Sequence, residues 1–316
     1  MFKSVKDVRA YCEKNKIEMI DFKMIDINGR WRHLAFPWKR LTEDTMKYGI
    51  GFDGSNYGYA AVEKSVVLVI GVNGVGKTTL LTLLCGLKKT TEGSITVDGI
   101  EPYSRNPELL SKQFYLADEM LTMPIKAVDY AKMTGEFWPD YSHERFLEIM
   151  ELFENDPQKK LNAMSTGQLK KTYISLALAL GCKYLYLDEP TNGLDIPSKA
   201  QFRSALMKYT SEDSTIIIST HQVRDLENII DPIIILDKQD VLMNASIEEI
   251  SQKLYFDYGT QIHPESLYSE QLPGGFIQVY PNAEGLESKV NIEALFNAVQ
   301  KNKELIKGLF PVADNK

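Results

Sequence analysis

One segment constrains the fold of this chain more than any other. The apolar, β-branched run Val66–Ile70 leads directly into Gly71–Thr79, and Leu80–Leu87 follows with helical spacing. The pattern G-x-x-x-x-G-K-[ST] between a strand and a helix is typical of a phosphate-binding loop. Ligands of such sheets bind at the carboxyl ends of the strands. The segment therefore predicts an α/β fold with a nucleotide site at that edge.

The residue types of this loop suit phosphate chemistry. Glycines let consecutive backbone N–H groups turn inward around phosphate oxygens, and the N-terminus of the following helix adds positive potential. Lys77 is placed to neutralise charge on the β- and γ-phosphates, and Thr78 to offer its hydroxyl to Mg²⁺. We expect nucleotide contacts from the loop residues Gly71, Asn73, Gly74, Gly76, Lys77, Thr78 and Thr79.

Two further strands end in groups that can act on a phosphate. Tyr184–Pro190 reads as a buried strand that finishes with Asp188, placed for Mg²⁺, and Glu189, placed for the attacking water. Ile216–Thr220 reads as a parallel-type strand that runs into His221. A histidine at that edge of a sheet with a phosphate loop is expected beside the γ-phosphate.

The order and spacing of the motifs resemble those of the ATP-binding-cassette (ABC) ATPases over about residues 66–245. The resemblance implies a P-loop core with a helical subdomain and catalysis by Glu189, His221 and Lys77. The Q-loop position holds Asp118 rather than Gln, and a carboxylate there can contact Mg²⁺ or its water. The corresponding motifs are Gly71–Thr79 (Walker A), Ser165, Gly167 and Gln168 (signature), Leu185–Glu189 (Walker B), Gly193–Asp195 (D-loop) and His221 (switch histidine).

The same resemblance implies ATP, Mg²⁺ and two partners. Two copies of the cassette would pair head to tail, so that the signature of each caps the γ-phosphate bound to the other. The helical region Phe137–Asp156 corresponds to the subdomain that docks on a transmembrane subunit. The implied location is cytoplasmic, peripheral to the inner face of a bacterial membrane. The transported substrate does not follow from these motifs.

Residues 1–65 predict a small α+β unit of another kind. A helix from Ser4 to Lys14 precedes two strands, with Asn28–Gly29 as a tight turn between them. The unit resembles the N-terminal β-grasp domain of glutamine synthetase, most specifically at Phe52–Ser55 and Lys64–Ser65. In that family the aspartate at the position of Asp53 reaches a neighbouring subunit's active site. Without the family's catalytic domain we expect no glutamine synthetase activity.

The two resemblances meet near Ser65/Val66, which suggests a chimera-like junction. We divide the chain into a β-grasp segment at 1–65, a nucleotide-binding domain at 66–240 with its helical subdomain at about 119–180, and an α+β C-terminal extension at 241–316. The extension reads as helix Ser246–Lys253, strands Leu254–Tyr258 and Phe276–Tyr280 separated by the turn Pro273–Gly275, and helices Val290–Val299 and Lys303–Phe310.

The upstream strands of an ABC domain, with their adenine-stacking aromatic residue, are replaced by the β-grasp sequence. Tyr48 and Tyr57 lie upstream, but nothing in their spacing places them under a base. One alternative is therefore a chimeric chain that folds and binds ATP weakly without transport or glutamine synthetase activity. A second is a soluble ABC protein that acts on ribosomes or DNA.

Charge and composition bear on these alternatives. The net charge is −7, with 12 Lys/Arg against 9 Asp/Glu in residues 1–65 and 24 against 34 in the rest. An acidic chain of pI about 5.3 lacks the footprint of a general nucleic-acid binder. No apolar run approaches the roughly 20 residues of a membrane helix. Cys12, Cys85 and Cys182 read as reduced core thiols.

Overall fold

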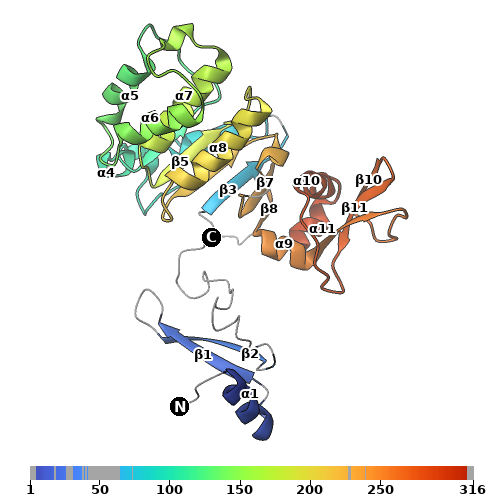
Figure 1. Cartoon of the computed structure of the whole chain (residues 1–316). Coiled ribbons are helices and arrows are strands. Elements are labelled where there is room, and N and C mark those ends of the chain that lie inside the picture. Colours follow the sequence, from blue (N-terminus) through green and yellow to red (C-terminus); the bar gives the residue numbers. More distant parts are fainter. Residues whose placement is uncertain are drawn as a thin grey trace. The chain divides into compact units, whose positions relative to one another are not determined.

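The computed structural model describes residues 5–17, 19–25, 31–37, 39, 41, 65–72, 74–226, 229–238 and 240–311. The chain divides into two compact units, Met1–Val62 and Glu63–Lys316, and each is described by itself (Figure 1). Several residues used above lie outside the described part: Ser4, Asn28–Gly29, Tyr48, Phe52–Ser55, Tyr57, Lys64 and Asn73.

The first unit contains the helix and two strands that the sequence predicts. Helix α1 spans Val5–Lys14 and buries Val5 and Cys12. Strands β1 (Met19–Ile25) and β2 (Trp31–Pro37) pair antiparallel, with Met19 opposite Pro37 and Ile25 opposite Trp31. This order and register confirm a helix followed by two paired strands.

The second unit is built on a six-stranded sheet with the order β4-β5-β6-β3-β7-β8. All neighbouring pairs are parallel except β7 with β8. The β-branched run before the loop supplies β3, which is buried and lies between β6 and β7. The strands are β3 (Ser65–Ile70), β4 (Gln113–Leu116), β5 (Tyr184–Asp188), β6 (Thr215–Ser219), β7 (Ile233–Asp237) and β8 (Asp240–Ala245).

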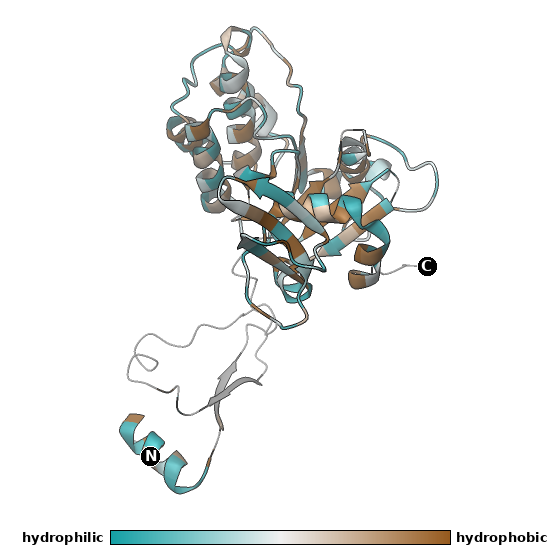
Figure 2. Ribbon diagram, turned by 90° about the vertical axis from the view of Figure 1, so that its right-hand side faces the viewer, coloured by the Kyte–Doolittle hydropathy of each residue, from teal (hydrophilic) through white to brown (hydrophobic). Residues whose placement is uncertain are grey.

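Helices lie beside this sheet, and most of them carry both hydrophobic and hydrophilic residues, as the hydropathy colours show (Figure 2). Helices α6 and α7 pack on each other and also contact α8, and their buried side chains join those of the sheet in one large core cluster. No helix in the described ranges is both long and apolar enough to cross a membrane. The helices are α3 (Lys77–Leu84), α4 (Pro107–Leu110), α5 (Ala127–Gly135), α6 (His143–Leu152), α7 (Thr166–Ala179) and α8 (Ile196–Tyr209), with short 3₁₀ turns η3 (Pro102–Ser104), η4 (Leu161–Ala163) and η5 (Val223–Asp225).

Two predicted helical regions have different limits in the structure. The region Phe137–Asp156 begins with a turn, and α6 starts only after Ser142, whose hydroxyl accepts a hydrogen bond from the Arg145 N–H. Pro139 lies in that turn, where it disfavours a helical residue before it. Helix α3 ends at Leu84 rather than Leu87, because Gly86 has a φ of 75° and a Cβ there would lie 2.2 Å from the Pro102 carbonyl oxygen.

The C-terminal extension is α+β as expected, but its strands are connected differently. The three-stranded sheet has the order β10-β11-β9, and the turn before Gly275 joins β10 to β11 rather than β9 to β11. Strand β10 is polar and lies at an edge, so its sequence carries little apolar alternation. The elements are α9 (Ile247–Lys253), β9 (Leu254–Gly259), β10 (Tyr268–Leu272), β11 (Gly275–Pro281), α10 (Ile292–Lys301) and α11 (Lys303–Leu309).

The chain also stays in the main sheet longer than expected. The nucleotide-binding domain is expected to end at residue 240, but β8 runs antiparallel to β7 and buries Leu242 and Met243. Buried residues of α10 and β11 belong to the same core cluster as those of the main sheet. The extension is therefore packed onto the core of the second unit. All three cysteines are free and buried.

Candidate active site

The phosphate loop has the backbone that its glycines predict. Gly74 and Gly76 have φ values of 83° and 103°, a left-handed conformation that favours glycine. A Cβ at either position would meet no atom within 4 Å, so the backbone angle rather than space requires glycine. Helix α3 begins directly afterwards without a side-chain cap, which leaves its first N–H groups free of side-chain partners. This geometry suits a phosphate group.

Lys77 lies over this loop although its side chain is only 8% exposed. Its Nζ donates a hydrogen bond of 3.0 Å to the Gly71 carbonyl oxygen and lies 3.7 Å from Glu189 Oε1. The loop and a carboxylate thus hold the ammonium group at the place where a phosphate would need a cation.

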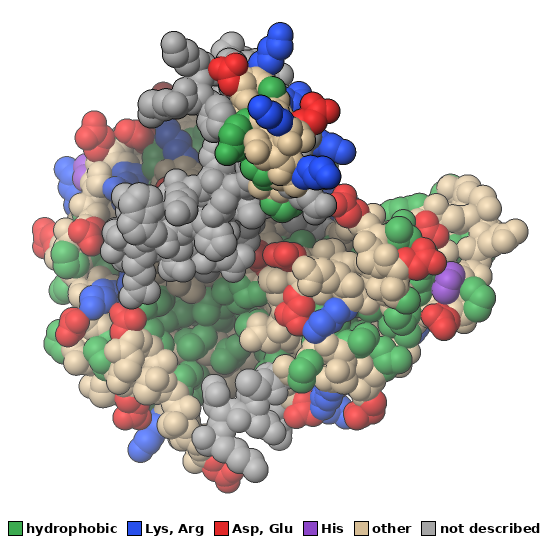
Figure 3. Space-filling view, turned by 90° about the horizontal axis from the view of Figure 1, so that it is seen from below, with side chains coloured by type: hydrophobic (Ala, Val, Ile, Leu, Met, Phe, Trp, Pro, Cys, Tyr) green, Lys and Arg blue, Asp and Glu red, His purple; other side chains and the backbone are tan. Residues whose placement is uncertain are grey.

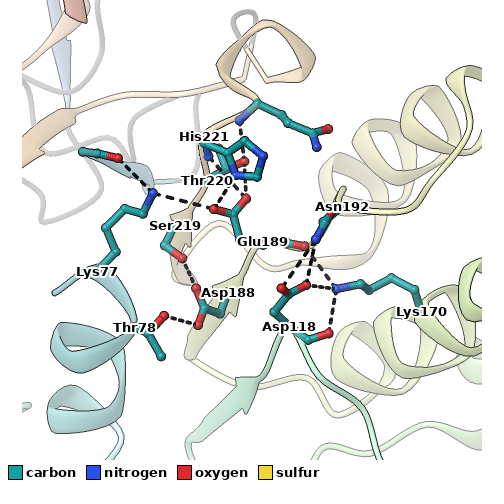
Figure 4. A network of polar contacts seen from close by, with 12 residues as sticks. Lys77, Thr78, Asp118, Lys170, Asp188, Glu189, Asn192, Ser219, Thr220 and His221 are labelled. Carbon is teal, nitrogen blue, oxygen red and sulfur yellow. Dashed lines mark hydrogen bonds and ion pairs between the residues drawn. The ribbon is translucent and has the colours of Figure 1, made fainter. Parts of the chain in front are cut away.

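Asp188 ends β5, and its carboxylate accepts hydrogen bonds from three hydroxyl groups, of which those of Thr78 and Ser219 are drawn in Figure 4. Its Oδ2 accepts hydrogen bonds from Thr78 Oγ1 at 2.7 Å and from Tyr115 at 3.2 Å, and its Oδ1 accepts one from Ser219. Burial and the neighbouring Asp188 charge raise the pKa of Tyr115, so its phenol stays protonated and donates. The Thr78 hydroxyl and the Asp188 carboxylate together are oxygen donors of the kind that Mg²⁺ prefers, so the residues fit this ion.

Glu189 follows Asp188 and points toward the opposite side of the same edge (Figure 4). Its Oε2 accepts hydrogen bonds from Thr220 Oγ1 at 2.9 Å and from the His221 N–H at 3.3 Å. Its Oε1 lies 2.8 Å from His221 Nδ1. The side chain is 12% exposed. The carboxylate therefore lies between the lysine of the loop and the histidine after β6.

Asp118 faces the same edge from the end of β4, but both of its carboxylate oxygens have protein partners. Oδ1 accepts hydrogen bonds from Lys170 Nζ at 3.0 Å and from Asn192 Nδ2 at 3.3 Å. Oδ2 lies 3.4 Å from the same Asn192 nitrogen. The predicted metal ligand is thus engaged by an ammonium and an amide in this structure.

These residues surround one pocket of about 420 Å³. None of its described lining residues belongs to the signature, and Asp195 is not among them either. The structure therefore brings the loop, the end of β5 and the switch histidine together and leaves Ser165, Gly167, Gln168 and Asp195 apart from them. The lining residues are Gly74, Gly76, Lys77, Thr78, Thr79, Asp118, Asp188, Glu189, Asn192 and His221.

The signature residues form the exposed start of α7. Ser165 and Gln168 make a reciprocal capping box, in which the Gln168 N–H bonds the serine hydroxyl and the Ser165 N–H bonds the glutamine oxygen. A Cβ on Gly167 would lie 3.4 Å from the Gly193 carbonyl oxygen, so the signature lies beside the D-loop of the same chain. These residues present a second polar surface, separate from the pocket.

Asp195 caps the neighbouring helix α8. Its Oδ1 accepts a hydrogen bond of 2.9 Å from the Ser198 N–H. The hydrogen bonds from Ser198 hold the pKa of Asp195 below its usual value. The carboxylate therefore stays ionised at neutral pH, at the exposed tip of the D-loop.

Sequence reasoning missed several side chains that complete the site. Ser219 and Thr220 lie in the segment predicted as the strand before His221, and that position alone could have suggested them. Tyr115 lies three residues before Asp118, and its position carries no signal of its own. Nothing in the local pattern distinguishes Lys170 from the lysine that follows it.

Comparison with known proteins supports both resemblances. Residues 56–192 match the family model described as ABC transporter, and residues 16–73 match that of the glutamine synthetase beta-Grasp domain. The energy-coupling factor transporter ATP-binding protein EcfA2 of Streptococcus pyogenes is 28% identical over 226 residues, which are 66% of this chain and 81% of that protein. The ABC transporter ATP-binding protein NatA of Bacillus subtilis is 27% identical over 197 residues, 60% of this chain and 80% of NatA.

Solved structures show the same fold. An ATP-binding subunit of an ABC transporter aligns with a TM-score of 0.54 at 19% identity, over 60% of this chain and 82% of its own. A dimeric ATP-binding cassette bound to ADP and Pi aligns with a TM-score of 0.51 at 24% identity, over 58% of this chain and 85% of its own. The α/β core with a helical subdomain that the sequence predicts is confirmed.

Proposed function

We propose that this chain, which carries an ABC transporter ATPase domain behind a glutamine synthetase β-grasp segment, is the ATP-hydrolysing subunit of a bacterial ABC transporter. The observation that carries the proposal is the position of the Glu189 carboxylate between Lys77 and His221, next to a phosphate loop. Release of phosphate from ATP by the purified chain tests it, with Glu189→Gln as the inactive reference.

Each group of the pocket has a chemical task in this proposal. The N–H groups of the loop and the first turn of α3 bind phosphate oxygens, and Lys77 neutralises charge as the γ-phosphoryl group leaves. Glu189 orients the attacking water and accepts its proton, because a carboxylate within hydrogen-bond reach of that water can act as a general base. His221 Nδ1, at 2.8 Å from Glu189 Oε1, holds that carboxylate in place.

We assign the Mg²⁺ site to Thr78 and Asp188, with Asp118 as a further predicted ligand. Thr78 supplies a hydroxyl and Asp188 a buried carboxylate, 2.7 Å apart. A bound Mg²⁺ would neutralise charge on the phosphates. Ser219 and Tyr115 fix the orientation of the Asp188 carboxylate, which keeps one geometry available to the ion.

The proposed active form is a head-to-tail dimer. In one copy the signature lies outside the pocket, so its serine needs a second copy to meet a γ-phosphate. Ile196, directly after Asp195, is 84% exposed. An apolar residue at this tip fits a surface that a second copy covers.

Removal of the signature cap gives a testable contrast. Ser165→Ala and Ser246→Ala each remove a serine hydroxyl that caps a helix, so each is expected to lower the free energy of unfolding by about 1 kcal/mol. Only Ser165→Ala is expected to lower ATP turnover, because its hydroxyl contacts the phosphate bound to the other copy. Thermal denaturation and phosphate release measure the two effects. Equal turnover in the two variants would contradict the role of the signature.

We assign the docking of a transmembrane partner to an apolar groove beside the helical subdomain. The groove has a volume of about 500 Å³, and Phe114 packs edge-on against Trp138 in it. Phe137 and Leu87 at its border are 76% and 57% exposed. An apolar segment of a membrane subunit is the occupant that would cover them, and it would place the chain at the inner membrane face.

The described part of the pocket favours weak recognition of the base. None of its described lining residues is Phe, Tyr or Trp. Base stacking on such a residue contributes about 1–3 kcal/mol. We therefore expect ATP to bind this chain more weakly than it binds an intact cassette with an adenine-stacking aromatic residue, measured by titration with a fluorescent ATP analogue. An affinity equal to that of the intact cassette would contradict this expectation.

The same observation keeps one alternative open, a chimeric chain that binds ATP weakly and does not hydrolyse it. The net charge of −7 argues against the other alternative, a nucleic-acid partner, and Asp and Glu side chains lie among the Lys and Arg side chains visible in Figure 3. Co-purification with a membrane protein would support the transporter assignment over both.

A further inference from the structure

Lys170 is the most deeply buried charged residue of the described chain. It is 1% exposed and lies in the second turn of α7, five residues after the capping residue Ser165. Its side chain points away from solvent and toward the ends of β4 and β5 (Figure 4). A buried ammonium is retained in a fold only where acceptors surround it, so its partners indicate what it does.

The ammonium group has three acceptors, which match its three N–H donors. Nζ donates to the Asp118 carbonyl oxygen at 3.2 Å, to Asp118 Oδ1 at 3.0 Å and to the Glu189 carbonyl oxygen at 3.1 Å. One side chain thus connects helix α7 with the segments that follow two different strands. None of these bonds reaches the phosphate loop.

The bond to Glu189 meets a backbone that needs support. Glu189 has a φ of 47°, a left-handed conformation that costs a non-glycine residue about 1 kcal/mol or more. Its N–H bonds the Ser219 carbonyl oxygen at 2.8 Å, and its carbonyl accepts the Asn192 N–H at 3.1 Å as well as Lys170. The backbone of Glu189 is held from both sides, and that backbone sets the direction of its carboxylate.

We propose that Lys170 is a positioning residue for Glu189: it holds the carbonyl of Glu189 and so keeps the carboxylate between Lys77 and His221. Asp118 balances the charge of Lys170 and anchors it. The inference rests on the proposed ATPase function and extends it to a residue outside the pocket lining. Lys170 itself does not touch the substrate.

Lys170→Met tests the proposal, with Lys171→Met as its matched control. Lys171 is the next residue of the same helix, and its Nζ also donates to a backbone carbonyl, that of Phe153 at 3.0 Å. Lys170→Met is expected to lower kcat about 100-fold, the loss that a displacement of about 1 Å can cause. The Kd for ATP should stay unchanged, since the phosphate contacts remain. Lys171→Met should keep the kcat of the wild type.

A double-mutant cycle separates positioning from stability. Lys170→Met leaves the Asp118 carboxylate without its cation, so it also lowers the melting temperature. Asp118→Asn combined with Lys170→Met removes both charges and should restore the melting temperature, because no unpaired charge then remains beside the methionine, although Asp118 itself is 41% exposed. Relative to Asp118→Asn alone, the double variant should still show the same loss of kcat. Any loss of kcat that comes from a contact of Asp118 with Mg²⁺ is present in both variants and cancels in this comparison.

The outcomes distinguish this inference from the function on which it rests. If the double variant recovers both its melting temperature and the kcat of Asp118→Asn alone, Lys170 only stabilises the fold. That result would overturn the positioning role. An active wild type with an equally active Lys170→Met would overturn it too. A wild-type rate equal to that of Glu189→Gln would contradict the proposed function, and the positioning role with it.

Discussion

Glu189→Gln is expected to lower the kcat for ATP hydrolysis about 100- to 10,000-fold, the contribution of a positioned general base. The substitution keeps the size of the side chain and an oxygen for the Thr220 hydroxyl, which lies 2.9 Å away. The fold and the phosphate contacts should therefore persist, and the Kd for ATP should change little. Phosphate release and equilibrium binding measured on the same preparation check both halves of this result.

Glu189→Gln should also accumulate as an ATP-bound dimer. If ATP holds two copies together and hydrolysis releases them, a chain that binds without hydrolysis accumulates in the bound form. Light scattering with ATP would then give twice the chain mass of 35.9 kDa. Glu151→Gln changes an exposed glutamate of α6 and serves as the control. A Glu189→Gln variant that turns over ATP as fast as this control would contradict the role of Glu189.

Lys77→Met is expected to weaken ATP binding about 10- to 100-fold, because hydrogen bonds to charged groups contribute about 1.5–3 kcal/mol. Methionine retains the apolar stem in this buried position and removes only the ammonium group. Hydrolysis should fall as well, since Lys77 neutralises charge on the transferring phosphoryl group. Titration with a fluorescent ATP analogue measures the first effect and phosphate release the second.

Lys88→Met is the matched control for this loss. Lys88 is exposed and lies just beyond the other end of α3. The substitution therefore also removes one positive charge from the region of this helix. The control should bind ATP as the wild type does. Equal affinities of Lys77→Met and Lys88→Met for ATP would exclude the loop as the phosphate site.

Features that depend on local backbone geometry could be predicted from the sequence. The glycines of Gly71–Gly76 are required because two of them adopt positive φ, and the β-branched run before them forms the buried strand β3. The two carboxylates at the end of β5 and the histidine after β6 follow because parallel strands end at one edge. Each of these signals lies within a few residues of the group that it places.

Features that depend on distant contacts could not be predicted in this way. Lys170 and Lys171 are neighbours with the same side chain, yet the first is buried against Asp118 and Glu189 and the second reaches Phe153. The direction of α7 against the sheet decides between them, and no local pattern encodes it. Strand β10 was missed for a related reason, since an edge strand needs little apolar alternation.

The central claim is that the pocket between Lys77, Glu189 and His221 hydrolyses ATP with Mg²⁺. Phosphate release by the purified full chain, measured over a range of ATP concentrations with and without Mg²⁺, tests it most directly. The account predicts saturable release that requires Mg²⁺ and is lost in Glu189→Gln. A rate that equals the Glu189→Gln rate at every ATP concentration would contradict it.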